Sequence, residues 1–157
     1  MWHHSDPRIR EYESLELFQG CTRRQVRMLV RLSTRLPAPT GRTLARQGSR
    51  RRELILVVEG AADVVRDGQV VDHLGAGDHC GEFTVLRNVP QPATVVAAAP
   101  SIIDVFEARE FIRAYEQIPA LHAAIDRTLD RRTAAWLSLP AGSTTTSPGS
   151  PVFPALR

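Results

Sequence analysis

The residues of this chain whose types and spacing could do chemistry lie between Gly81 and Ala97, in the stretch GEFTVLRNVPQPATVVA. Gly81 and Glu82 open about one predicted helical turn, and backbone N–H groups at the start of such a turn can bind an anion. A Pro-rich bend with Gln91 and Pro92 follows, and then a β-branched strand. Gln91 carries no charge and Pro92 has no backbone N–H. The stretch therefore predicts an anion-binding loop that lacks a cation at its bend.

No pattern of catalytic residues accompanies this loop. His73, His79 and Cys80 are the one cluster that suggests a metal or a nucleophile, and adjacent His79 and Cys80 would point to opposite faces of an extended chain. Zinc sites need ligand pairs at spacings such as C-x₂-C, which the sequence does not contain. The G-x-S-x-G, P-loop and H-E-x-x-H motifs are also missing. We therefore expect no catalytic residue, no bound metal and no enzymatic activity.

The stretch from Gly81 resembles the phosphate-binding cassette of the cyclic nucleotide-binding domain family, to which catabolite activators and regulatory subunits of protein kinase A belong. Seven residues match the cassette pattern without a gap, namely Gly81, Glu82, Phe83, Leu86, Ala93, Thr94 and Val95. Turn residues of the family's β-roll have counterparts in Gly41, Gly48, Gly60, Asp67-Gly68 and the run from Gly75 to Asp78. The resemblance covers roughly residues 15 to 137 and is specific, because many glycines fall at matching offsets.

The resemblance implies a ligand pocket with a degenerate cassette. In the family, the counterpart of Glu82 accepts a hydrogen bond from the ribose 2′-hydroxyl, and an arginine at the bend pairs with the cyclic phosphate. The pocket positions carried over are Gly81, Glu82, Phe83, Thr84, Gln91, Pro92, Ala93 and Thr94. Gln91 offers one neutral donor in place of the arginine, Pro92 removes another donor, and an unscreened Glu82 would repel a phosphate. We expect these changes to weaken cyclic-nucleotide binding by a factor on the order of hundreds. Arg87 is the nearby cation that could substitute.

Hydrophobic periodicity predicts the elements that must position this loop. Helical spacing over Ile9–Phe18, and a capping box formed by Thr22 and Gln25, predict N-terminal helices within about 8–33. Over about 34–108, short apolar runs alternate with turn signals, of which Asp67-Gly68 is the clearest hairpin turn. With the resemblance, this predicts an α+β fold: an eight-stranded antiparallel, jelly-roll-like β-roll, followed over about 108–138 by helices that include a hinge and lid helix.

Length and composition fit one globular domain over residues 1–138. The chain has 157 residues, 43% of them apolar, and no apolar run near the roughly 18 residues that a membrane span needs. The N-terminus has no signal-peptide core, so we expect a cytoplasmic protein without membrane association. Residues 139–157 are rich in Pro, Ser, Thr and Gly and predict a disordered tail. The eighteen residues from Pro140 are too few for a winged helix-turn-helix of roughly 60 residues, so we expect a free-standing domain.

The excess of positive charge lies in the N-terminal third of the chain. Residues 1–53 hold twelve Arg against five acidic residues, whereas residues 54–157 hold eight Arg against twelve. The densest basic run is Arg50, Arg51 and Arg52, which is either a solvated hairpin tip or a surface for an acidic partner. No aromatic residues are interleaved with it for base stacking, so we expect no sequence-specific DNA binding.

Two functions from different classes remain open. The first is a regulatory or interaction module that keeps the roll as a scaffold, has weak or no cyclic-nucleotide affinity, and acts through a protein partner. The second is a small-molecule sensor that binds cAMP, cGMP or another phosphorylated ligand beside Glu82 and signals through its C-terminal helix. That helix resembles the family's lid helix, which implies a homodimer contact as a further option. No cofactor is expected apart from such a nucleotide.

Overall fold

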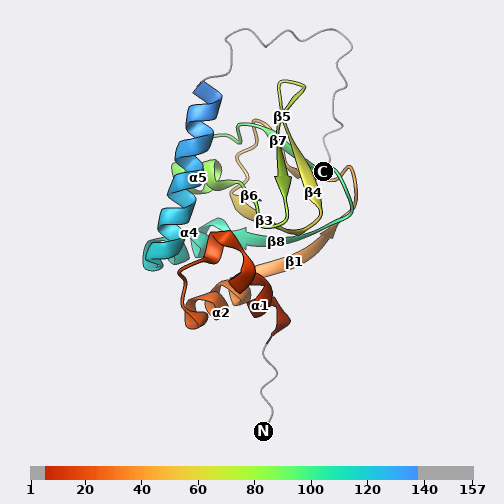
Figure 1. Cartoon of the computed structure of the whole chain (residues 1–157). Helices are drawn as coiled ribbons and strands as arrows, with labels where there is room; N and C mark the ends of the chain where they lie inside the picture. The colour runs from red at the N-terminus through yellow and green to blue at the C-terminus, as the bar shows by residue number, and fades with distance from the viewer. Residues whose placement is uncertain (1–5, 138–157) are drawn as a thin grey trace.

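The computed structural model describes residues 6–137, and its eight strands form two four-stranded sheets in which every pairing is antiparallel (Figure 1). The first sheet has the order β1 (Ser33–Ala38), β8 (Ser101–Glu107), β3 (Glu53–Glu59) and β6 (His79–Cys80). The second has the order β2 (Thr43–Ala45), β7 (Thr94–Ala97), β4 (Ala61–Arg66) and β5 (Gln69–Gly75). The α+β fold with an eight-stranded antiparallel roll is confirmed. The predicted tail lies outside the described residues.

Helices precede and follow the roll in the chain, and one short helix lies between β6 and β7. Their bounds are α1 (Pro7–Ser14), the 3₁₀ turn η1 (Glu16–Phe18), α2 (Arg23–Leu32), α3 (Glu82–Arg87), α4 (Ala108–Gln117) and α5 (Pro119–Leu137). In Figure 1, α1 and α2 lie next to β1 and β8, whereas the long α5 runs alongside the roll. The capping box of Thr22 and Gln25 is present at the start of α2. Asp67 and Gly68 both have positive φ and form the predicted hairpin turn between β4 and β5.

The first helix is shorter than the sequence predicts. The periodicity over Ile9–Phe18 indicates one helix, but α1 ends at Ser14 and Leu15 has extended backbone angles before η1. This break lets the rings of Tyr12 and Phe18 stack with a centroid distance of 4.7 Å. Residues six apart in a continuous helix do not share a face. Tertiary packing of the two aromatic rings therefore overrides the local helical pattern.

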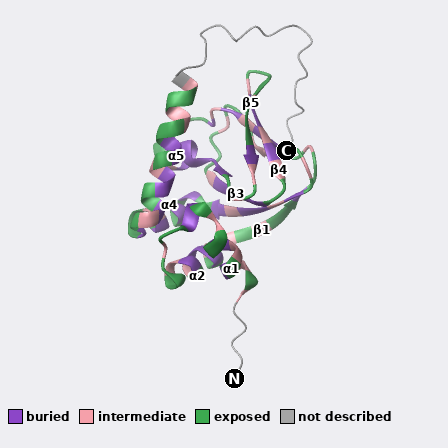
Figure 2. Cartoon of the chain, viewed as in Figure 1, coloured by how far each residue is buried: buried purple, intermediate pink, exposed green. Residues whose placement is uncertain are grey.

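Two hydrophobic clusters stabilise the fold. One lies between the sheet of β3 and β8 and the helices, where α2 contributes Val26, Leu29 and Val30. The other fills the interior of the roll with side chains from both sheets, such as Val57 and Val95. Figure 2 shows the consequence for α2 and α5, each of which has one buried and one exposed side. The helices are thereby fixed against the roll by apolar burial.

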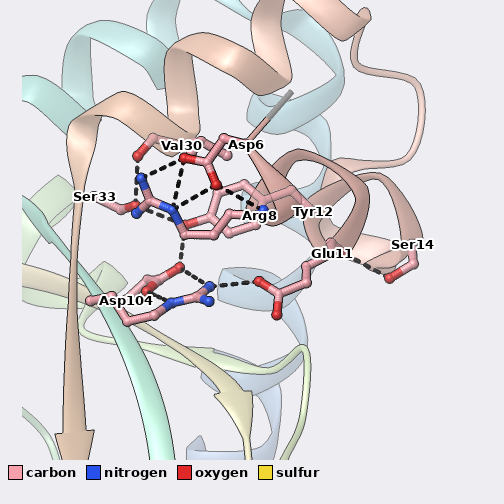
Figure 3. A network of polar contacts seen from close by, with 9 residues as sticks. Asp6, Arg8, Glu11, Tyr12, Ser14, Val30, Ser33 and Asp104 are labelled. Atoms are coloured by element: carbon pink, nitrogen blue, oxygen red, sulfur yellow. Dashed lines mark hydrogen bonds and ion pairs between the residues drawn. The ribbon is translucent and has the colours of Figure 1, made fainter. Parts of the chain in front are cut away.

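A buried polar network joins α1 to β1 and β8 (Figure 3). The Asp104 carboxylate is fully buried and accepts a 2.6 Å hydrogen bond from the Tyr12 hydroxyl and a 2.8 Å bond from Arg35 Nε. Arg35 Nη2 also donates to Glu11 at 2.8 Å. Burial, the main cause, and the bond to Asp104 raise the pKa of Tyr12. Because every member is paired, the network holds the N-terminal helix in one position.

Within residues 6–137, no helix combines the length and the apolar character that crossing a membrane requires.

Candidate functional site

Gly81 turns the chain from β6 into α3. Its φ is +95°, a value that favours glycine, and a Cβ at this position would lie 2.0 Å from the carbonyl oxygen of Glu53. Only a glycine therefore fits between α3 and β3. The turn places Glu82 at the first position of α3, with its side chain directed into the protein and 1% exposed.

Glu82 forms a buried ion pair with a residue of the C-terminal helix. Arg132 Nη1 contacts Glu82 Oε1, and Arg132 Nη2 donates a 2.6 Å hydrogen bond to the carbonyl oxygen of His79. Burial alone would raise the pKa of Glu82, but the adjacent His79 ring and the Arg132 guanidinium lower it to about 2. The expectation of an unscreened Glu82 was wrong, because Arg132 of α5 screens it. The two residues are fifty positions apart in the sequence, so local patterns do not reveal their contact.

The site keeps unused hydrogen-bonding capacity. His79 is 4% exposed, and its Nδ1 lies 3.4 Å from Glu82 Oε2. Within residues 6–137, neither ring nitrogen of His79 nor Glu82 Oε2 has a hydrogen-bond partner. Buried polar atoms without a partner are uncommon in folded proteins. Glu82 Oε2 is thus an ionised acceptor that a hydroxyl group could satisfy.

A cavity of about 340 Å³ lies beside Glu82. Six of the eight pocket positions carried over from the family line it: Gly81, Glu82, Phe83, Gln91, Pro92 and Ala93. The remaining two use their hydroxyls elsewhere, since Thr84 donates to the Gly81 carbonyl oxygen and Thr94 accepts from the Gln47 N–H. The apolar part of the wall comes from the roll and includes Val64, Val71, Leu74 and Val95. The cavity has the size and mixed lining of a small-molecule pocket.

The bend is held in place by its backbone. The Gln91 N–H donates to the Ser49 carbonyl oxygen and the Gln91 carbonyl oxygen accepts from the Gly48 N–H, both at 2.8 Å. Gln91 is 7% exposed, and it lines the cavity with an uncharged side chain. The bend therefore keeps a fixed main chain and lacks a cation.

The charged side chains that line the cavity cancel each other. The two positive side chains of the lining are Arg131 and Arg132, and the two negative ones are Asp72 and Glu82. Arg87 is not among the lining residues, and its guanidinium lies 5.8 Å from the centre of the Phe83 ring. The cations at the cavity thus come from α5, and the predicted substitute at Arg87 does not lie there.

An aromatic residue of α5 closes one side of the cavity. Trp136 packs against Phe83 with a centroid distance of 4.5 Å, and the Arg66 guanidinium lies 5.8 Å from the centre of the Trp136 ring. The sequence pattern placed Arg132 on the same helix face as Leu121 and Ile125 but did not indicate its partner. The sequence signal for Arg132 was a cation on the buried face of an amphipathic helix. No sequence signal indicated that Trp136 contacts the site.

The run Arg50, Arg51 and Arg52 divides into different roles. Arg52 donates to the carbonyl oxygens of Thr84 at 3.1 Å and Val85 at 2.6 Å, and Arg51 pairs with Glu53 at 2.9 Å. A cation at the carbonyl end of a short helix is electrostatically favourable. Arg52 therefore supports α3, and the run is not a uniform partner surface.

No group of three or more His, Cys, Asp and Glu side chains within residues 6–137 is arranged to hold a metal ion. His79 and Cys80 are both buried in β6. Burial, the main cause, raises the pKa of the Cys80 thiol to about 12, which leaves it protonated and unreactive at neutral pH.

The ionisation of Glu82 predicts an acid-sensitive step in stability. Its pKa falls from an ordinary value of 4.5 to about 2 in the folded protein. A lowered folded-state pKa stabilises the fold above pH 4.5, and this contribution is lost as the pH falls from about 4.5 to 2. We expect the difference in unfolding free energy between the unaltered protein and Glu82→Gln to shrink by about 3 kcal/mol over that range.

Urea unfolding at a series of pH values measures this difference. Glu16→Gln changes an exposed carboxylate on η1 and should show no such step. A pH-independent difference for Glu82→Gln would contradict the assigned ionisation.

Comparison with known proteins agrees with this geometry. A family model, the cyclic nucleotide-binding domain, matches residues 35–118. Acetyltransferase Pat of Mycolicibacterium smegmatis is 30% identical over 138 residues, which span 85% of this chain and 41% of that protein. The chain spans 41% or less of the length of such curated relatives.

Solved structures share the fold. The structure of cAMP-bound PfPKA-R (141-441) has a TM-score of 0.78 at 15% identity and is matched over 87% of this chain and 47% of that one. The regulatory subunit of a cAMP-independent protein kinase A from Trypanosoma brucei has a TM-score of 0.68 at 25% identity, over 80% of this chain and 44% of that one. With a family model that covers more than half of its residues, a complete roll and a cassette at α3, this chain belongs to the cyclic nucleotide-binding domain family.

Proposed function

We propose that this protein is a non-catalytic regulatory module that binds cyclic nucleotides weakly or not at all and acts through a protein partner. The observation that carries the proposal is the bend, where Gln91 and Pro92 line the cavity in place of a cation and a backbone donor. Two missing contacts to one desolvated phosphate, each worth about 1 to 3 kcal/mol, remove most of the affinity for an anionic ligand. The cancelling charges of the lining add no net attraction for it.

The relatives support a regulatory role. The segment similar to this chain covers 41% of Pat, so more than half of that acetyltransferase lies outside the shared fold. The Trypanosoma brucei protein is a regulatory subunit of a kinase that is independent of cAMP. Both comparisons fit a fold that regulates another activity, and they include a regulator to which cAMP is not essential. A cytoplasmic location remains part of this proposal.

Titration calorimetry tests the weak binding. We expect cAMP and cGMP to bind the unaltered protein no more tightly than about 10 μM, because the bend supplies neither a charge nor a backbone N–H at Pro92. Gln69→Arg, which places an arginine at an exposed position of β5 that does not line the cavity, serves as a matched control and should behave as the unaltered chain does. A submicromolar constant for the unaltered chain would contradict the proposed effect of Gln91 and Pro92.

A second candidate function is a sensor for a different small molecule, and the cavity itself favours it. The space of about 340 Å³ beside Glu82 is not filled by side chains, and Glu82 Oε2 has no hydrogen-bond partner within residues 6–137. Arg132 and Trp136 connect this space to α5, so a ligand there would change the contacts of the helix. Ligand-induced protection of α5 in hydrogen exchange, with no cyclic nucleotide present, would favour the sensor.

A further inference from the structure

The exposed face of α2 carries a strip of positive charge. Arg23, Arg24, Arg27 and Arg31 are all exposed, while the helix has no acidic residue. Arg24, Arg27 and Arg31 follow the spacing i, i+3, i+7 and therefore share one side of the helix over about 10 Å. The opposite side, with Val26, Leu29 and Val30, packs into the core. The strip is thus held rigidly on the surface of the domain.

This strip opposes the stability of its own helix. Arg27 has like-charged neighbours four residues away on both sides, Arg23 and Arg31, and such pairs destabilise a helix. Arg23 and Arg24 also lie in the first turn, where the helix dipole disfavours a cation. Arg23 lies 3.9 Å from a carboxylate oxygen of Glu13, and Arg8, Arg35 and Arg132 are also paired with carboxylates. Arg24, Arg27 and Arg31 make no ion pair with any residue from 6 to 137. Of these three, Arg31 lies in the last turn, where the helix dipole favours a cation, whereas Arg24 and Arg27 gain no such stabilisation from the helix.

A groove runs along the strip. Its volume is about 760 Å³, and we call it the basic groove, lined by Thr22, Arg24, Gln25, Arg27, Met28, Arg31, Gln117 and Ile118. No acidic side chain is among these residues. Half-buried Met28 offers an adaptable apolar contact between the arginines. The groove therefore combines three unpaired cations with an apolar floor.

We propose that the basic groove binds an acidic segment of a partner protein, with carboxylates about one helical turn apart and an apolar side chain on Met28. Charge complementarity selects such a segment. The chain's own residues 138–157 contain no Asp or Glu and do not meet this requirement. The exposed large apolar side chains of residues 6–136 are Leu36, Val70 and Val89, and none of them lies on α2 to enter a membrane. No aromatic side chain lines the groove to stack on a nucleic-acid base.

The groove is connected to the pocket through α5. Gln117 and Ile118 join α4 to α5, and α5 carries Arg132 to Glu82. A partner seated in the groove would contact the residues about which α5 would move. This proposal rests on the proposed action through a protein partner and is independent of which small molecule, if any, enters the cavity.

Fluorescence anisotropy with the full-length protein tests the groove. The probe is a short labelled helical peptide with Glu at i, i+3 and i+7 and a Leu beside them, and the control peptide has Gln for Glu. We expect the Glu peptide alone to bind, with an affinity that falls as salt is raised. Arg27→Glu should weaken binding at least about tenfold. Arg50→Glu makes the same charge change on an exposed residue outside the groove and should alter binding less than about twofold.

A stability measurement distinguishes loss of the binding surface from loss of the fold. Arg27→Glu replaces two like-charged pairs by two opposite-charged pairs on α2, so its urea midpoint should be unchanged or higher. Four results would each overturn the proposal: no binding of the Glu peptide, equal binding of the Gln peptide, equal losses for Arg50→Glu and Arg27→Glu, or preferential binding of duplex DNA or anionic vesicles. None of these four results changes the expected outcome of the cyclic-nucleotide titration. A failure of the groove proposal can therefore be distinguished from a failure of the proposed weak nucleotide binding.

Discussion

The double variant Gln91→Arg, Pro92→Ala is expected to bind cAMP about 100-fold more tightly than the unaltered chain. The guanidinium would add a charge-assisted bond to the phosphate, and replacing the proline would restore a backbone N–H, which together supply about 3 kcal/mol. The main chain at Gln91 is already held by Ser49 and Gly48, so little reorganisation is needed. Because Glu82 is neutralised by Arg132, the incoming phosphate would not meet an isolated negative charge.

Titration calorimetry of both single variants and the double variant measures this gain. Gln69→Arg adds the same charge at an exposed position of β5 outside the cavity lining and should give no gain. If the double variant gains nothing while its urea midpoint is unchanged, the cavity does not admit a nucleotide, and the role of the bend in affinity is refuted.

Arg132→Ala is expected to destabilise the fold by about 3 to 5 kcal/mol. Removing one partner of a buried ion pair leaves the other charge without compensation. Glu82 is 1% exposed, so its carboxylate is poorly hydrated when Arg132 is absent. Arg132 lies close to the end of α5 and could turn toward solvent when Glu82 is removed. We therefore expect Glu82→Gln to cost less than Arg132→Ala.

Urea unfolding at neutral pH measures both variants. The matched control is Arg131→Ala, which removes the exposed neighbouring arginine and should change stability by less than about 0.5 kcal/mol. The combination of Glu82→Gln with Arg132→Ala should recover part of the loss, because no buried charge remains. Equal effects of Arg131→Ala and Arg132→Ala would show that the ion pair does not secure α5.

The β-roll was predictable because its signals are local. The turn of Asp67 and Gly68 needs positive φ at both positions, and the capping box of Thr22 and Gln25 lies within one helical turn. The composition of the bend was equally readable, since the missing charge of Gln91 and the missing N–H of Pro92 are properties of single residues. The prediction of one helix over Ile9–Phe18 was wrong for a different reason. The stacking of Tyr12 on Phe18 in the folded chain outweighs the helical period of the sequence.

The partners of the site were not predictable. Local pattern does not reveal that Arg132 reaches Glu82 across fifty residues, that Arg52 supports the end of α3, or that Trp136 packs on Phe83. Each of these contacts depends on where α5 and the β3 strand lie against α3, which is decided by the packing of the hydrophobic clusters. The same packing leaves the cavity open and exposes the strip on α2.

By itself, the sequence determined the family, the roll and the loss of the bend cation, because glycines, prolines and uncharged side chains constrain the chain wherever they stand. Only the tertiary structure decided that Glu82 is neutralised, that the cations at the cavity come from α5, and that Arg24, Arg27 and Arg31 line a groove whereas Arg52 bonds to α3. The physical reason is that ion pairs and cavities arise between elements distant in sequence, and their energies depend on burial that only the folded chain creates.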